Sequence, residues 1–108
     1  MASKVDRIQD ESLRTALQDA QTALRTGDYK KVVELASGAY VELLRRKPEL
    51  LQGQAQFMSV MFFPRLGAHL VVNTNGVPEI VWDREKFIFS EAITYYEYTV
   101  DNLIKNKL

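Results

Sequence analysis

The chain's single histidine, His69, lies four positions after Arg65. This pairing suggests catalysis, because histidine exchanges a proton near neutral pH. Pro64 and Gly67 interrupt the preceding helical pattern, and the residues after His69 favour a strand. A lone histidine at the start of a strand is more often a partly exposed structural residue. We therefore expect a structural His69 and keep catalysis by Arg65 and His69 as an alternative.

The spacing of Arg65 and His69 loosely resembles the Arg-to-His motif of HEPN-type ribonucleases. In that family the pair acts on the RNA phosphodiester, within a mainly helical setting and at a longer spacing. The resemblance implies the alternative function, a small hydrolase or RNA-processing factor that uses Arg65 and His69.

Other chemistry has less support in the residue types. With one histidine and no cysteine, carboxylates are the main metal ligands that remain. No pair of carboxylates has the spacing, or the neighbouring histidines, of a zinc or di-iron site. Glu97 and Asp101 are one helical turn apart, which is typical of a solvated face. The five glycines are isolated, so none forms a phosphate-binding loop. We expect no metal and no cofactor.

Charge and hydropathy narrow the classes of partner. Fourteen basic and fourteen acidic residues give a formal net charge of zero, whereas nucleic-acid binders usually carry a basic excess. We therefore expect no bulk nucleic-acid binding. No apolar run approaches the ~18 residues that span a bilayer, so we expect no membrane partner and a cytoplasmic location. A length of 108 residues predicts a single domain, 1–108.

Apolar residues spaced three and four apart predict two consecutive helices in the first half of the chain. The first is expected to end at Gly27, and the second to begin after Asp28 and end before Pro48. A short turn between them predicts an antiparallel helical hairpin. The seam should be lined by small residues, namely Ala16, Ala20, Ala36 and Ala39.

In the second half of the chain, the spacing of apolar residues changes from a helical pattern to one that is typical of strands, and then back. Residues 48–63 predict a third helix, and residues 70–82 predict a β-hairpin that turns at Asn75-Gly76. Asp83 is expected to cap a last helix that runs nearly to Leu108. The predicted fold class is α+β and mainly α, a four-helix domain with a β-hairpin inserted between helices 3 and 4.

Residues 16–48 resemble a tetratricopeptide-type helical hairpin, most clearly at Gly27-Asp28-Tyr29 in the turn and at Ala39 on the second helix. The resemblance covers about a third of the chain. It implies a helical hairpin and a role in protein interaction. No second copy of the pattern follows, so a peptide-binding superhelix is not implied.

The last predicted helix is apolar around much of its circumference. Its main face includes Phe89 and Tyr96, while Ile88 and Tyr95 lie on one flank and Tyr98 lies near the opposite face. We do not expect so small a domain to cover all of these side chains. This surplus predicts a homodimer, with Ile88, Tyr95, Tyr98 and Trp82 as binding residues.

The favoured function is therefore a non-enzymatic protein-interaction module. Its expected partner is a second copy of itself, with another protein as a further candidate. A third possibility is a small-ligand sensor, whose pocket would be lined by Trp82 and tyrosines.

Overall fold

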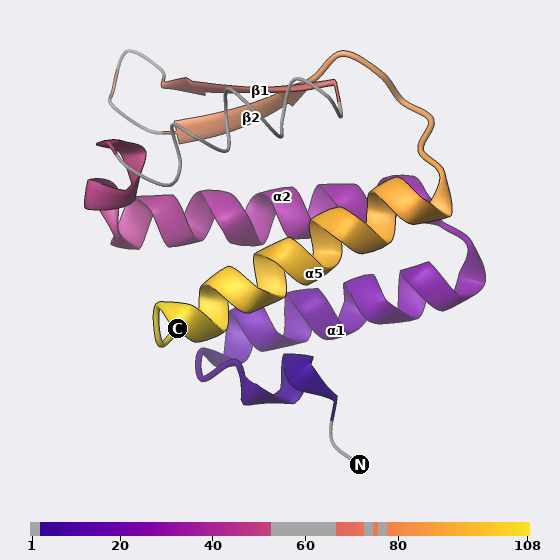
Figure 1. Ribbon diagram of the computed structural model, residues 1–108, viewed down its shortest axis with the longest axis horizontal. Coiled ribbons are helices and arrows are strands. Elements are labelled where there is room, and N and C mark those ends of the chain that lie inside the picture. The colour runs from indigo at the N-terminus through magenta and orange to yellow at the C-terminus, as the bar shows by residue number, and fades with distance from the viewer. Residues whose placement is uncertain (1–2, 53–66, 73–74, 76–77) are drawn as a thin grey trace. The chain divides into compact units, whose positions relative to one another are not determined.

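The computed structural model describes residues 3–52, 67–72, 75 and 78–108 (Figure 1). In chain order, the elements are the 3-10 helix η1 (Lys4–Arg7), α1 (Glu11–Thr26), α2 (Tyr29–Arg46), the 3-10 helix η2 (Pro48–Gln52), β1 (Ala68–Val72), β2 (Pro78–Trp82) and α5 (Phe89–Lys105). The chain divides into two compact units. The first contains Met1–Tyr40 and Lys86–Leu108, and the second contains Val41–Glu85. The single-domain prediction stays a prediction.

Helix α1 ends at Gly27 as its sequence predicts, and it begins after an N-cap at Asp10, for which no prediction was made. The Asp10 side chain accepts a hydrogen bond from the Leu13 N–H at 2.9 Å, which satisfies a backbone donor of the first turn. At the other end, Gly27 has a φ of 82°, in the left-handed region where glycine carries no steric penalty. Two residues then connect α1 to α2, and the two helices run in opposite directions (Figure 1).

The core of the first unit is built on one face of each helix. Helix α5 lies beside α1, and η1 packs against both (Figure 1). Val5 and Ile8 are each only 1% exposed. Because full burial of such a side chain contributes about 1.5–3 kcal/mol, these two residues are the main anchors of the N-terminal segment. The core side chains from the three helices include Leu13, Leu17, Ala20, Ala23, Val32, Val33, Ala36, Ala92, Tyr95, Val100 and Leu103.

Polar contacts join the first residues of this unit to its last. The backbone N–H of Asp10 donates to the carbonyl oxygen of Leu108 at 2.8 Å, and the N–H of Gln9 donates to the same oxygen. The Lys4 ammonium is 2.7 Å from the Asp101 carboxylate, and both side chains are more than half exposed. An ion pair this exposed contributes at most about 1 kcal/mol, so the burial of Val5 and Ile8 dominates.

The second unit contains the end of α2, η2 and the two strands. Strand β1 pairs antiparallel with β2, with Ala68 opposite Trp82. The N–H of Asp83 donates to the Gly67 carbonyl at 2.8 Å, directly beyond this pair. Gly67 has a φ of 84°, and a Cβ at this position would collide with the Asp83 carboxylate. Position 67 therefore requires glycine for two reasons: the backbone has a positive φ, and there is no room for a Cβ.

The predicted fold class is wrong, because the described residues contain three α-helices rather than the four of the predicted domain. Where the third helix was expected, the described chain forms only the five-residue η2. Pro48 suits the first turn of either helix type, and the bond from the Leu50 N–H to the Lys47 carbonyl is of the tighter 3-10 kind. Residues 53–63 of the expected helix, and the turn residue Gly76, lie outside the described residues. The described part of the chain is mainly helical.

The last helix also begins later than expected. Ile88 is its N-cap residue and Phe89 its first helical residue, so Asp83 does not cap it. None of the helices in the described ranges is long and apolar enough to cross a membrane.

Candidate functional site

The start of α5 exposes two consecutive large apolar side chains. Ile88 is 60% exposed and Phe89 is 48% exposed. Ile88 is the N-cap residue, and its side chain makes no capping hydrogen bond. Its own N–H donates to the Glu91 carboxylate at 3.1 Å. Isoleucine is among the poorest N-cap residues, and replacing a good cap by an apolar residue costs roughly 1 kcal/mol.

An aromatic contact extends this exposed region onto α2. The Phe89 ring meets the Tyr29 ring edge to face, with centroids 6.0 Å apart and an interplanar angle of 71°. Tyr29 is half-buried at the first position of α2. We call Tyr29, Ile88 and Phe89 the α5-start surface. The sequence pattern placed Phe89 on the main buried face, but a first helical residue extends beyond the core that covers the later turns.

The structure places the other predicted binding residues of α5 differently. Tyr95 is fully buried, at 0% exposure, so its side chain offers no surface to a second chain. Tyr98 is half-buried, and its ring centroid lies 5.9 Å from that of Tyr40 on α2. The expectation that so small a domain leaves this flank of the helix uncovered is therefore wrong for Tyr95.

Two polar residues explain how that flank can be buried. Thr99 and Asn102 are 0% and 5% exposed. The Thr99 hydroxyl donates to the Tyr95 carbonyl at 2.9 Å, and the Asn102 amide donates to the Tyr98 carbonyl at 2.8 Å. Because these side chains find acceptors on their own helix, burying them leaves no donor unsatisfied.

Burial raises the pKa of the Tyr40 and Tyr95 hydroxyls above the ordinary value of 10.0. The nearby Tyr98 raises both further, while a hydrogen bond with Ser37 acts in the opposite direction on Tyr95. Burial disfavours the phenolate because charge is poorly solvated there. Both tyrosines are neutral at physiological pH and serve the packing of the unit.

The structure describes only one member of the predicted catalytic pair. Arg65 lies outside the described residues. The backbone of His69 lies in β1 opposite Val81. Trp82 is half-buried at the end of β2, in a different compact unit from Tyr95 and Tyr98. The catalytic alternative and the sensor alternative both stay predictions.

A groove lies between η1, α1 and α5, with a volume of about 280 Å³. It is lined by Ser3, Lys4, Val5, Gln21, Tyr96, Glu97 and Val100. The sequence offered no hint of this groove, because its lining comes from three distant segments. Over the ranges that the structure describes, no group of three or more His, Asp or Glu side chains is placed to hold a metal ion.

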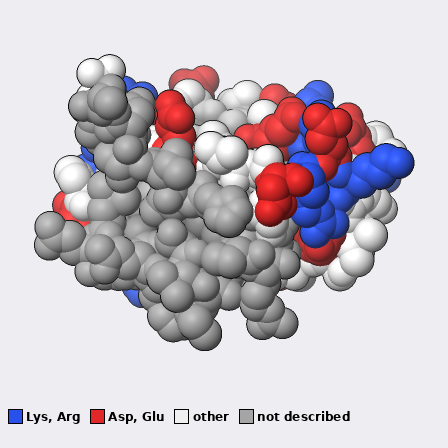
Figure 2. Space-filling model, turned by 90° about the horizontal axis from the view of Figure 1, so that it is seen from above, with Lys and Arg blue, Asp and Glu red and all other residues white. Residues whose placement is uncertain are grey.

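Charged side chains of both signs are intermixed on the described surface that Figure 2 shows. Ion pairs also form along α2, where Lys30 lies 4.0 Å from Glu34 and Arg46 lies 3.0 Å from Glu42. These exposed or half-exposed pairs contribute little to stability.

Comparison with protein-family models, with curated proteins and with solved structures finds no match to the chain. The likeness of residues 16–48 to a tetratricopeptide-type hairpin stays a prediction.

Proposed function

We propose that this chain is a non-enzymatic protein-interaction module that self-associates through the α5-start surface. The observation that supports this most directly is Ile88. It is the most exposed of the large apolar side chains in the described residues, and it occupies an N-cap where a polar residue would stabilise the helix. An apolar residue that costs stability and faces solvent is explained by a partner that covers it.

A second copy of the chain suits this surface for two reasons. In a two-fold dimer the same patch is used on both subunits, so each Ile88 would be covered by the other subunit's apolar residues. The rings of Tyr29 and Phe89 supply the aromatic surface that is enriched in such interfaces. The formal net charge of zero also leaves little repulsion between copies.

The test is the variant Ile88→Asp, measured by light scattering after size exclusion at tens of micromolar protein. Aspartate is a good N-cap residue and places a negative charge at the positive end of the helix dipole. We therefore expect the variant to remain folded while it becomes monomeric. Unfolding by urea, followed by circular dichroism, verifies that the fold is retained.

The matched control is Thr94→Glu, which adds the same charge to an exposed position of α5 away from the α5-start surface. This control should remain dimeric. A monomeric wild type would contradict self-association. A dimer that survives Ile88→Asp would place the interface elsewhere and refute the role of this surface.

A further inference from the structure

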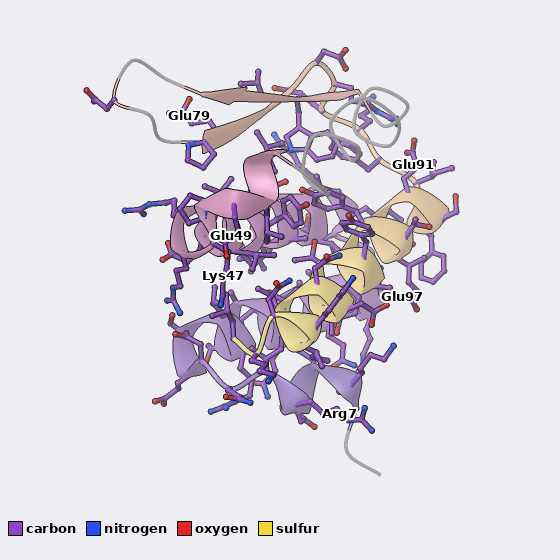
Figure 3. The ribbon with its side chains drawn as sticks, turned by 60° about the vertical axis from the view of Figure 1, so that its left-hand side comes forward. Arg7, Lys47, Glu49, Glu79, Glu91 and Glu97 are labelled. Carbon is purple, nitrogen blue, oxygen red and sulfur yellow. The ribbon has the colours of Figure 1, made fainter. Side chains whose placement is uncertain are left out.

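Residues 3–8, which we call the strap, pack against α1 and α5 ahead of the first α-helix. Val5 and Ile8 are buried, whereas Arg7 is exposed and points away from the two helices (Figure 3). The backbone of the strap forms only the short 3-10 helix η1, whose hydrogen-bond geometry is poorer than that of an α-helix. With two buried side chains and one such turn, the strap is less stable than the helices that it covers.

Two contacts between side chains of the strap and side chains of the helices are exposed. The Lys4 ammonium lies 2.7 Å from the Asp101 carboxylate of α5, and the Gln18 amide of α1 donates to the Asp6 carboxylate at 3.0 Å. Because water competes for these groups, both contacts add little to the stability of the closed strap.

The residues that follow the strap are bonded to the end of α5. Beyond this helix, the Leu108 N–H donates to the Leu103 carbonyl at 3.0 Å, as in a Schellman motif. In that motif the residue at the position of Lys107 is left-handed and is usually glycine. The Leu108 carbonyl then accepts the N–H groups of Gln9 and Asp10, the two residues that link the strap to α1.

The backbone at Lys107 is strained. Its φ is 62°, and Lys107 is the one non-glycine residue with a positive φ in the part of the chain that the structure describes. L-residues avoid this conformation because Cβ comes too close to the following carbonyl oxygen. Such a conformation persists where surrounding contacts hold it, and here these include the bonds from Gln9 and Asp10 to Leu108. The closed strap and the strained turn therefore depend on each other.

We propose that the strap and the turn at Lys107 open and close as one unit while the three α-helices stay folded. Opening breaks the bonds to the Leu108 carbonyl and lets Lys107 return to a favoured φ. It also uncovers Tyr96 and Val100 of α5, which line one groove with Val5. The strap is therefore a cover that hides an apolar surface of α5 until it is released. This device uses none of the α5-start surface and is independent of self-association.

The test is native-state hydrogen exchange of the ¹⁵N-labelled chain, followed for each amide by NMR. The amides of Gln9, Asp10 and Leu108 are the reporter amides. Their protection factors should agree within about twofold, because one opening exposes all three. They should lie at least about tenfold below those of Leu17 and Ala36, which are inside α1 and α2.

The variant Val5→Ala tests the coupling from the strap. It removes buried methyl groups, so the protection of the distant Leu108 amide should fall by about tenfold. The matched control is Val81→Ala, at an exposed valine of β2, which should leave that amide as in the wild type. Circular dichroism verifies that the helices are retained in both variants.

The variant Lys107→Gly tests the coupling from the turn. It relieves the left-handed strain, less the extra flexibility of glycine in the open state, and should raise the protection of Gln9 and Asp10 by about fourfold. The matched control Lys105→Gly makes the same change at the last helical residue of α5 and should not raise it.

Four results would each overturn the proposal. Reporter amides as protected as Leu17 would mean that the strap opens only when the helices unfold. Unprotected reporter amides would mean that it is not closed. Unchanged protection of Leu108 in Val5→Ala, or of Gln9 and Asp10 in Lys107→Gly, would mean that the strap and the turn open separately.

Discussion

Two glycines of the first unit can each be replaced by alanine, one in a right-handed helical conformation and the other in a left-handed conformation. Gly38 lies in the interior of α2, and Gly27 ends α1 with a φ of 82°. At both positions an added Cβ would meet no atom within 4 Å. Replacing either glycine by alanine therefore changes the backbone energetics without creating a clash, so the pair isolates the effect of φ.

The expected magnitudes follow from conformational preferences. Gly38→Ala should raise the free energy of unfolding by about 0.5–1 kcal/mol, because alanine loses less entropy in a helix. At Gly27, the left-handed conformation costs an L-residue about 1–2 kcal/mol. Alanine also makes the unfolded chain less flexible, and this stabilises the folded state by about 0.4–1 kcal/mol. Gly27→Ala should therefore lower the free energy of unfolding by about 0.8 kcal/mol, the difference between the middle values of these opposing effects.

The measurement is urea unfolding followed by circular dichroism, with both variants and the wild type in one buffer. The midpoint should rise for Gly38→Ala and fall for Gly27→Ala at an unchanged slope. Shifts of the same sign would refute the argument, because the local space is equal and only φ differs. A destabilised Gly38→Ala would show that α2 is not regular at this position.

Three further perturbations test other parts of the fold. Ala20→Leu should cost about 1–3 kcal/mol in urea unfolding, because Ala20 is fully buried and a larger side chain overpacks its site; a neutral result would contradict its place in the core. Gly67→Ala should lower the melting temperature, since φ is 84° and the Asp83 carboxylate occupies the Cβ position; an unchanged melting temperature would show that this turn is not closed as described. The pKa values of Tyr40 and Tyr95 are raised in the folded chain, so both hydroxyls must lose a proton more readily when the chain unfolds. The stability that these neutral tyrosines give is complete below pH 10. As the pH rises above 10, the free energy of unfolding should fall by up to about 1.4 kcal/mol per pH unit for each tyrosine. Urea midpoints from pH 9 to 11 measure this slope, and Tyr40→Phe should reduce it.

Local rules predicted the first two helices well and the second half of the chain less well. The boundary at Gly27 depends on one residue's backbone preference, which the sequence shows directly. Burial of Tyr95 depends on how the rest of the fold covers the flank of α5, and a helical wheel contains no such information. The exposure of Phe89 has a related origin, because it depends on where the helix begins relative to its neighbours. The groove at Tyr96 could not be predicted, since residues far apart in sequence create it.

The first unit is assembled from two separated parts of the chain, Met1–Tyr40 and Lys86–Leu108. During synthesis, α1 and the first turns of α2 therefore leave the ribosome well before α5 does. At typical rates of elongation, α5 follows on the order of 3 to 14 seconds later. Throughout that interval α1, with its buried residue Leu17, lacks the helix that packs against it in the finished fold. The nascent chain consequently presents a transient target for chaperones, and the unit can complete its folding only after its last helix is made.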